Sequence, residues 1–141
     1  MIEKHKETGV KIKTAIFPGR FQPPHIGHIL TIMRIYPDYD KILVAVVKDP
    51  YEKRVLSTEE VIKILRTIFK HLPKIEVIDG GLKFQYRSSF KDLPPFDVVV
   101  GGNKKTIQHL KKLGIKTRYV PRSGGYNSTA IRNAGLSEQW R

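Results

Sequence analysis

The stretch that decides the fold reads Phe17-Pro18-Gly19-Arg20-Phe21-Gln22-Pro23-Pro24-His25-Ile26-Gly27-His28. It follows a short apolar run, residues 14–17, that predicts a strand, and it precedes an amphipathic run, residues 26–36, that predicts a helix. Gly19 lets the backbone leave the strand and approach a ligand, while the two prolines keep the loop extended until the helix begins. The free N–H groups and the positive dipole end of that helix predict a phosphate site.

Two histidines and an arginine in this loop suit the transfer of a nucleotidyl group between phosphates. His25 and His28 stand at positions i and i+3, so both imidazoles can point the same way from the first helical turn. The transfer needs the α-phosphate held in line and its developing negative charge neutralised. Arg20, the two imidazoles and the helix N-terminus supply that stabilisation, and Gly27 leaves room for a nucleotide. Zinc binding is the alternative, but the chain has no cysteine and no third ligand lies nearby.

Composition limits the class of protein. The 141 residues suffice for one domain, expected to span residues 1–141, with a flexible or loosely packed segment at residues 1–11. The 26 Lys and Arg against 13 Asp and Glu give a formal net charge of +13, which implies anionic partners. The lack of cysteine excludes disulfides, and no apolar run is long enough for a membrane span or a secretory leader. A cytoplasmic protein without a membrane partner is therefore expected.

Predicted strands and helices alternate along the chain. The strands are expected at 13–17, 42–47, 74–78, 97–100 and 116–120, and the helices at 26–36, after the capping residue Ser57, at 104–113, and from Ser128 or Thr129. This order predicts an α/β fold: a single Rossmann-like domain with a parallel sheet of about five strands and helices on both faces. Ligands of such sheets bind beyond the carboxyl ends of the strands. Segments rich in Gly, Lys or His follow the strands at 18–28, 48–54, 79–81, 101–105 and 121–129, which predicts a nucleotide site there.

Two later segments are expected to join this site. Ser128 and Thr129 offer hydroxyls and helix N-terminal N–H groups to phosphate oxygens, and Arg132 adds a bidentate clamp. Taken alone, an ordinary helix cap with a surface arginine explains these residues as well. Gly101-Gly102-Asn103 ends the fourth strand, and its glycines permit close approach of a base or ribose, although a tight turn explains them equally.

His25-Ile26-Gly27-His28 resembles the HxGH signature of the nucleotidyltransferase superfamily, and residues 126–132 resemble its second signature, which grips the β- and γ-phosphates. Gly19-Arg20-Phe21-Gln22-Pro23 is similar to the form seen in archaeal-type nicotinamide-nucleotide adenylyltransferases. Pantetheine-phosphate adenylyltransferases and glycerol-phosphate cytidylyltransferases usually have Gly-Thr-Phe-Asp there. Class I aminoacyl-tRNA synthetases share the HIGH tetrapeptide, but they are far longer and carry a KMSKS loop that is missing here.

The resemblance implies an enzyme that transfers AMP from Mg-ATP to a phosphomonoester acceptor and releases pyrophosphate. The loop after the second strand would then supply a phosphate-binding lysine, Lys48 or Lys53. Mg²⁺ would be held mainly by phosphates and water, and no protein metal site is expected. The catalytic residues would be His25, His28, Arg20 and Arg132, and the nucleotide-binding residues Gly19, Phe21, Gly27, Lys48, Gly101, Gly102, Asn103, Ser128 and Thr129.

Nicotinamide mononucleotide is the expected acceptor, because Arg20 in place of threonine suits a second anionic group. Phosphopantetheine, FMN and glycerol phosphate (with CTP) are the alternatives. Four aromatic residues could stack on a planar acceptor, although the first and third also fit a core: Phe84, Tyr86, Phe90 and Trp140. A homo-oligomer is expected and nucleic acid is not an expected partner. The second hypothesis is a non-catalytic nucleotide or RNA binder, which needs a basic stripe beyond the strand ends and salt-sensitive binding.

Overall fold

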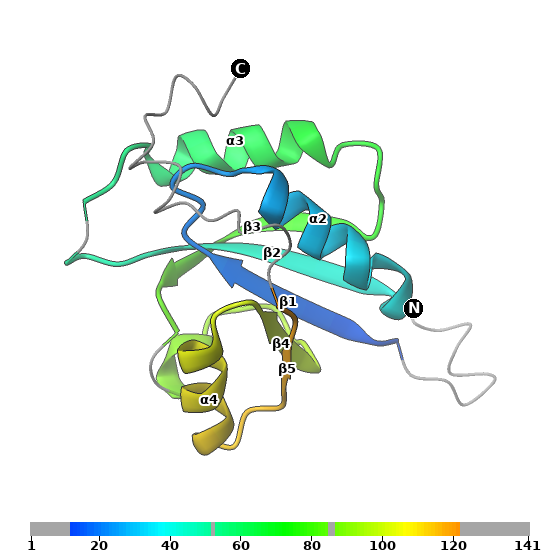
Figure 1. Ribbon diagram of the computed structural model, residues 1–141, viewed down its shortest axis with the longest axis vertical. Coiled ribbons are helices and arrows are strands. Elements are labelled where there is room, and N and C mark those ends of the chain that lie inside the picture. The colour runs from blue at the N-terminus through cyan, green and yellow to red at the C-terminus, as the bar shows by residue number, and fades with distance from the viewer. Residues whose placement is uncertain (1–11, 52, 85–86, 122–141) are drawn as a thin grey trace.

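The structure, a computed structural model, describes residues 12–51, 53–84 and 87–121. They form a five-stranded parallel sheet of order β3-β2-β1-β4-β5 (Figure 1). The strands are β1 (Thr14–Gly19), β2 (Lys41–Lys48), β3 (Ile75–Leu82), β4 (Val98–Gly101) and β5 (Thr117–Tyr119). The helices are α2 (Ile26–Ile35), α3 (Thr58–Ile68) and α4 (Lys104–Lys112), with short 3-10 helices η1 (Tyr36–Asp38) and η2 (Arg87–Phe90). The predicted α/β fold is confirmed.

Apolar side chains cover both faces of the sheet. Because side chains alternate along a strand, Ala15 and Phe17 of β1 pack with α2 and α3, whereas Ile16 between them packs with α4. Figure 1 shows α2 and α3 on one side of the sheet and α4 on the other. β2 is buried from its second to its seventh residue, as its unbroken apolar run predicted for a covered parallel strand. None of the described helices is long and apolar enough to cross a membrane.

The predicted start of α3 is confirmed in detail. The Ser57 hydroxyl accepts a hydrogen bond from the Glu60 N–H at 3.1 Å, and the Glu60 carboxylate accepts one from the Ser57 N–H at 2.9 Å. This reciprocal pair is the capping box that the sequence indicated. The helix expected at 104–113 is also confirmed: α4 ends at Lys112, and Gly114 just beyond it has a φ of 84°, a conformation that glycine adopts without steric cost.

The predicted end of the third strand at residue 78 is wrong, because β3 continues through Asp79-Gly80-Gly81 to Leu82. Val46 pairs with Asp79 and Val47 pairs with Gly81, so Gly80 is the extra residue of a β-bulge. A Cβ on Gly80 would lie 2.9 Å from a methyl carbon of Val47, and Gly81 has a φ of 73°. The two glycines therefore serve a bulge within a strand rather than its end.

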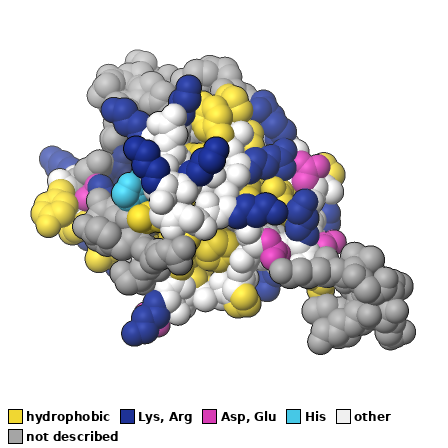
Figure 2. Space-filling model, turned by 90° about the horizontal axis from the view of Figure 1, so that it is seen from below, with side chains coloured by type: hydrophobic (Ala, Val, Ile, Leu, Met, Phe, Trp, Pro, Cys, Tyr) yellow, Lys and Arg dark blue, Asp and Glu magenta, His cyan; other side chains and the backbone are white. Residues whose placement is uncertain are grey.

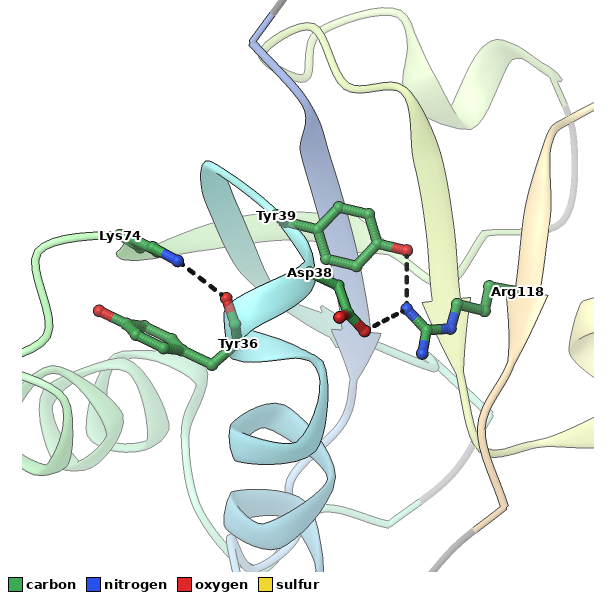
Figure 3. Close-up of polar contacts among 5 residues, drawn as sticks. All are labelled: Tyr36, Asp38, Tyr39, Lys74 and Arg118. Atoms are coloured by element: carbon green, nitrogen blue, oxygen red, sulfur yellow. Dashed lines mark hydrogen bonds and ion pairs between the residues drawn. The ribbon is translucent and has the colours of Figure 1, made fainter.

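Polar contacts near the start of β2 tie η1 to the neighbouring strands (Figure 3). Arg118 of β5 donates hydrogen bonds to the Asp38 carboxylate at 2.9 Å and to the Tyr39 hydroxyl at 3.2 Å. On the other side, the ammonium of Lys74, just before β3, donates to the Tyr36 carbonyl at 3.1 Å. These contacts anchor the turn between α2 and β2, and α2 carries the candidate site at its opposite end.

Several predictions from the sequence concern residues outside the described ranges. They are the loosely packed segment at residues 1–11, the short helix from Ser128 or Thr129, and the aromatic roles of Tyr86 and Trp140. Phe84 and Phe90 are described, and their rings lie 4.7 Å apart within the cluster that packs under α4. Phe84 is buried in this core as predicted, and Phe90 is partly buried and packs against it.

Candidate active site

A cleft of about 530 Å³ lies at the carboxyl ends of β1, β2 and β4. Its volume is typical of sites that enclose small molecules, and its position is the sheet edge that the sequence predicted. Loops after the strands line it together with the first turns of α2 and α4. The cleft brings together these predicted site residues: Gly19, Arg20, Phe21, His25, Gly27, His28, Gly101, Gly102 and Asn103.

The two candidate lysines of the loop after β2 are not among the described residues that line this cleft. Val47 and Asp49 line it, whereas Lys48 between them is not among the described lining residues, as the alternation of side chains along a strand would give. Lys53 is exposed on the loop after β2. Ser128, Thr129 and Arg132 lie outside the described residues, so their roles stay predictions.

The two histidines themselves form the start of α2. His25 is the N-cap residue, and its Nδ1 accepts a hydrogen bond from the Gly27 N–H at 3.0 Å. His28 accepts one through its own Nδ1 from the His25 N–H at 3.1 Å. A backbone N–H donates only to a ring nitrogen that carries no proton, so each neutral imidazole keeps its proton on Nε2. The two hydrogen bonds of the capping box therefore place the proton of each neutral ring on Nε2, and each Nε2–H is a hydrogen-bond donor.

The ring of His28 lies between two other rings. Its centroid is 3.8 Å from that of His25, and 4.6 Å from that of Phe21 in an edge-on arrangement. Phe21 is 1% exposed, and its φ of 52° places it in the left-handed region that few residues other than glycine adopt. The tightly held Phe21 ring thus supports the orientation of His28.

Gly19, which also lines the cleft, makes room for this ring. A Cβ built on Gly19 would lie 2.7 Å from Cζ and 2.9 Å from Cε2 of Phe21, distances that side chains do not tolerate. The sequence suggested that glycine here allows a ligand to come close to the backbone. In the structure the Phe21 ring fills that space, so Gly19 acts on the site through the packing of Phe21.

Gly19→Ala is expected to destabilise the protein by about 1–3 kcal/mol, the usual cost of overpacking a filled site. The cause is the clash with Phe21, so the added replacement Phe21→Leu should recover part of the loss. Thermal unfolding of the two single variants and the double variant measures this coupling. Strictly additive losses would show that the alanine does not meet the ring.

The cleft contains an ion pair that the sequence did not indicate. The Lys83 ammonium donates to the Asp49 carboxylate at 2.8 Å, and Asp49 is 5% exposed. The Lys83 hydrogen bond, followed by one from the Tyr51 N–H, holds the pKa of Asp49 below its ordinary value. The sequence predicted that the third strand ends at Ile78, which gave no reason to place Lys83 at the cleft. In the structure β3 extends to Leu82, and Lys83 directly after it lines the cleft.

Three side chains of α4 also line the cleft and were missed: Lys105, Thr106 and His109. Their spacing puts them on one face of a helix, a signal that the sequence did contain. Asn103 caps the same helix, since its side-chain oxygen accepts a hydrogen bond from the Thr106 N–H at 3.2 Å. The loop after β4 thus presents a capped helix N-terminus and a lysine to the cleft.

The charges around the cleft favour an anionic ligand. Arg20, Lys83 and Lys105 supply cations, and the imidazole Nε2–H groups and the start of α2 add donors. Asp49 is the one carboxylate among the described lining residues, and Lys83 already pairs with it. Within the described ranges, no group of three or more His, Cys, Asp or Glu side chains could hold a metal ion. The arrangement can bind a polyphosphate and stabilise charge that develops on it.

Comparison with known proteins gives concordant matches. A family model described as cytidylyltransferase-like matches residues 16–134. Among curated relatives, the phosphopantetheine adenylyltransferase of Bdellovibrio bacteriovorus is 36% identical over 75 residues, which cover 52% of this chain and 47% of that protein. The chain matches less than half the length of the first such relatives.

Solved structures share the fold at low sequence identity. A bifunctional NMN adenylyltransferase/ADP ribose pyrophosphatase from Francisella tularensis aligns with a TM-score of 0.70 and 18% identity, covering 90% of this chain and 43% of that one. The complex of that bifunctional enzyme with AMP and a manganese ion aligns with a TM-score of 0.62 and 19% identity, covering 87% and 41%. These likenesses extend over nearly all of the chain.

Proposed function

This chain belongs to the cytidylyltransferase-like family, and we propose on that premise that it transfers AMP from Mg-ATP to a phosphomonoester, releasing pyrophosphate. The observation that carries the proposal is the pair of imidazoles at the start of α2, whose Nδ1 atoms accept backbone N–H groups. We assign the Nε2–H groups of these two rings as donors to an anion beside Arg20. This arrangement fits a reaction whose transition state gains negative charge on the α-phosphate.

The reaction needs no covalent intermediate with the enzyme. An oxygen of the acceptor phosphate attacks the α-phosphorus of ATP, and the bond from that phosphorus to the bridging oxygen breaks as pyrophosphate leaves. The acceptor phosphate is already an anion, so no side chain has to remove a proton from it. His25 and His28 stabilise the charge on the α-phosphate and the bridging oxygen, and Arg20 contacts the phosphates.

The two ends of the cleft divide the substrates between them. Gly101, Gly102 and Lys105 border the end formed by β4 and α4, where the ribose and phosphates of ATP would lie. Lys83 and Asp49 border the other end and would face the acceptor. The proposed contacts to the leaving pyrophosphate come from a further set: Ser128, Thr129 and Arg132.

Mg²⁺ would arrive bound to the phosphates of ATP. The described cleft offers it Asp49, whose carboxylate is engaged by Lys83 and by the Tyr51 N–H, so phosphates and water supply most ligands. When bound, the ion adds neutralising charge to the polyphosphate. The protein's own part is to orient the phosphates through Arg20 and the imidazoles.

Nicotinamide mononucleotide is the first acceptor to test, because Arg20 adds a charged fork suited to a second nucleotide phosphate. Phosphopantetheine is the second candidate, because a curated relative 36% identical to this chain is named as its adenylyltransferase. The aromatic argument for a planar acceptor is weaker than the sequence suggested, since Phe84 is 5% exposed and packs on Phe90. FMN, and glycerol phosphate with CTP, complete the panel.

Release of pyrophosphate by the purified chain tests the proposal. ATP and CTP are each supplied with Mg²⁺ and one of the four acceptors, and we expect the highest kcat/KM for ATP with nicotinamide mononucleotide. A higher kcat/KM with phosphopantetheine would change the acceptor and keep the reaction. No pyrophosphate with any pair would overturn nucleotidyl transfer itself.

The basic surface keeps a second candidate function open, a binder of RNA. Figure 2 shows Lys and Arg side chains spread over the face on which α4 lies. α4 has no acidic residue in its first turn and exposes lysines along its whole length: Lys104, Lys105, Lys111 and Lys112. An RNA binder would lose affinity steeply as salt rises, roughly in proportion to the number of phosphates it neutralises. Titration with a short RNA at two salt concentrations separates this function from nucleotide binding.

Assembly as a homo-oligomer and a cytoplasmic location stay predictions.

Gly102→Val is expected to weaken ATP binding by about tenfold or more, because a branched side chain would occupy the space proposed for the base or ribose. Gly102 lines the cleft and is half-buried, so the change should affect affinity more than thermal stability. Calorimetric titration of ATP into Gly102→Ala and Gly102→Val should show losses that grow with side-chain size. Equal affinities in folded proteins would put the base elsewhere.

A further inference from the structure

The Gln22 side chain binds the loop between β2 and α3, residues 49–57, to the histidine loop. The Gln22 side-chain oxygen accepts hydrogen bonds from the N–H groups of Val55 and Leu56, both at 2.8 Å. Its amide nitrogen donates to the Leu56 carbonyl at 2.9 Å. Gln22 is 3% exposed, the three bonds are partly buried, and they join segments more than thirty residues apart in sequence.

The chemistry of these bonds requires a side-chain amide. One end of the group must accept two N–H groups while the other end donates to a carbonyl, which a glutamine does and a carboxylate does not. Glutamate would leave the Leu56 carbonyl facing an oxygen, and methionine would remove the bonds of three backbone groups. The Gln22 amide thus forms with residues 55 and 56 the kind of hydrogen bonds that the backbone of a neighbouring segment would form.

The rest of the loop is fixed at its two ends. At the start, the Asp49 carboxylate accepts the Tyr51 N–H at 2.9 Å and pairs with Lys83. At the end, Ser57 caps α3. Between these anchors the loop exposes Tyr51 and, next to the Gln22 contacts, the cations Lys53 and Arg54. Gln22 is therefore the contact that sets where those cations stand relative to the imidazoles, because it belongs to the same loop as His25.

We propose that Gln22 is a positioning residue, which holds the Lys53-Arg54 segment at a fixed place relative to His25 and His28. Lys53 and Arg54 are not among the described residues that line the cleft, so the proposal includes that the polyphosphate of a bound substrate extends beyond the cleft to this segment. A misplacement of about 1 Å in such a reaction can cost roughly 10²-fold. The inference rests on the proposed nucleotidyl transfer for its kinetic consequence.

The test uses the full chain with Gln22→Met, which keeps the shape of the side chain and removes its bonds. The matched control is Gln108→Met, on an exposed glutamine of α4 that is not among the described residues lining the cleft. Hydrogen exchange should speed up by about tenfold or more at the amides of Val55 and Leu56 in Gln22→Met only. Unchanged exchange at these two amides would overturn the proposal.

Kinetics separate positioning from mere support of the fold. Gln22→Met should lower kcat/KM by about tenfold or more, and Lys53→Ala should cost activity in the wild type but little further in Gln22→Met, since its ammonium is already misplaced. Lys63→Ala, on an exposed lysine of α3, should change neither background. Additive losses from Gln22→Met and Lys53→Ala would overturn the positioning role.

The failure of the proposed function is recognised separately. If the wild type releases no pyrophosphate with any acceptor, nucleotidyl transfer fails, and the affinities for a non-hydrolysable ATP analogue and for the phosphorylated acceptors replace the rates. The same loss of the Lys53 effect in Gln22→Met then supports the proposal, and its persistence overturns it.

Discussion

We expect His28→Ala to lower turnover by about 10²–10³-fold, the typical cost of removing one hydrogen-bond donor from a site that stabilises developing charge. The His28 Nδ1 accepts the His25 N–H, so its Nε2 carries the donating proton. The ring is held between His25 and Phe21, which fixes the direction of that donor before any substrate binds. Pyrophosphate release under single-turnover conditions measures the chemical step directly.

His28→Gln is the matched variant, because glutamine at the third helical position accepts the N-cap N–H in an ordinary capping box. It should keep the start of α2 and the thermal stability close to those of the wild type, while its turnover stays as low as that of His28→Ala. Turnover within a few-fold of the wild type in either variant would show that His28 serves only the helix.

Replacement of His25 is expected to have the second large effect on turnover. Two variants separate its structural role as the N-cap of α2 from its chemical role in the reaction. Asparagine is among the best N-cap residues, so His25→Asn can still accept the Gly27 N–H, whereas His25→Ala cannot. Both variants lose the Nε2–H donor and should lose about 10²–10³-fold in turnover. The alanine variant alone should lose a further stability of about 1 kcal/mol.

Thermal unfolding and turnover of the two His25 variants, measured side by side, check this division. Equal stability of the two would mean that the imidazole does not cap α2 in solution. Turnover preserved in His25→Asn would mean that an acceptor at the N-cap, rather than the imidazole donor, is what the reaction uses.

The features that could be predicted from the sequence are those that depend on short local sequence patterns. The turn from β1 into α2 carried its glycine, prolines and histidines within twelve residues, and the capping box at Ser57 was visible as Ser, Thr and two Glu. The unbroken apolar run of β2 showed a strand covered on both faces. The alternation of these elements predicted a parallel sheet, and with it the edge that holds the cleft.

What escaped prediction depends on contacts between distant segments. Nothing near Gln22 in sequence indicates that its amide binds Val55 and Leu56, and nothing near Asp49 indicates Lys83. The use of histidines as caps was also hidden, because their chemistry suggested a role toward a ligand and not toward their own helix. Such pairings appear only when the strands are placed side by side.

The bulge in β3 changes which side of the sheet the odd-numbered residues of the strand face. Before the bulge, odd-numbered residues such as Val77 face α2 and α3. The extra residue at Gly80 reverses this alternation, so that the odd-numbered Lys83 lies on the same side as Asp49 and pairs with it at the cleft. A one-residue insertion in an ancestral strand would therefore suffice to exchange the side chain offered to an acceptor, leaving every upstream pair intact. Relatives that differ in length by one residue here should differ in which residue stands opposite position 49.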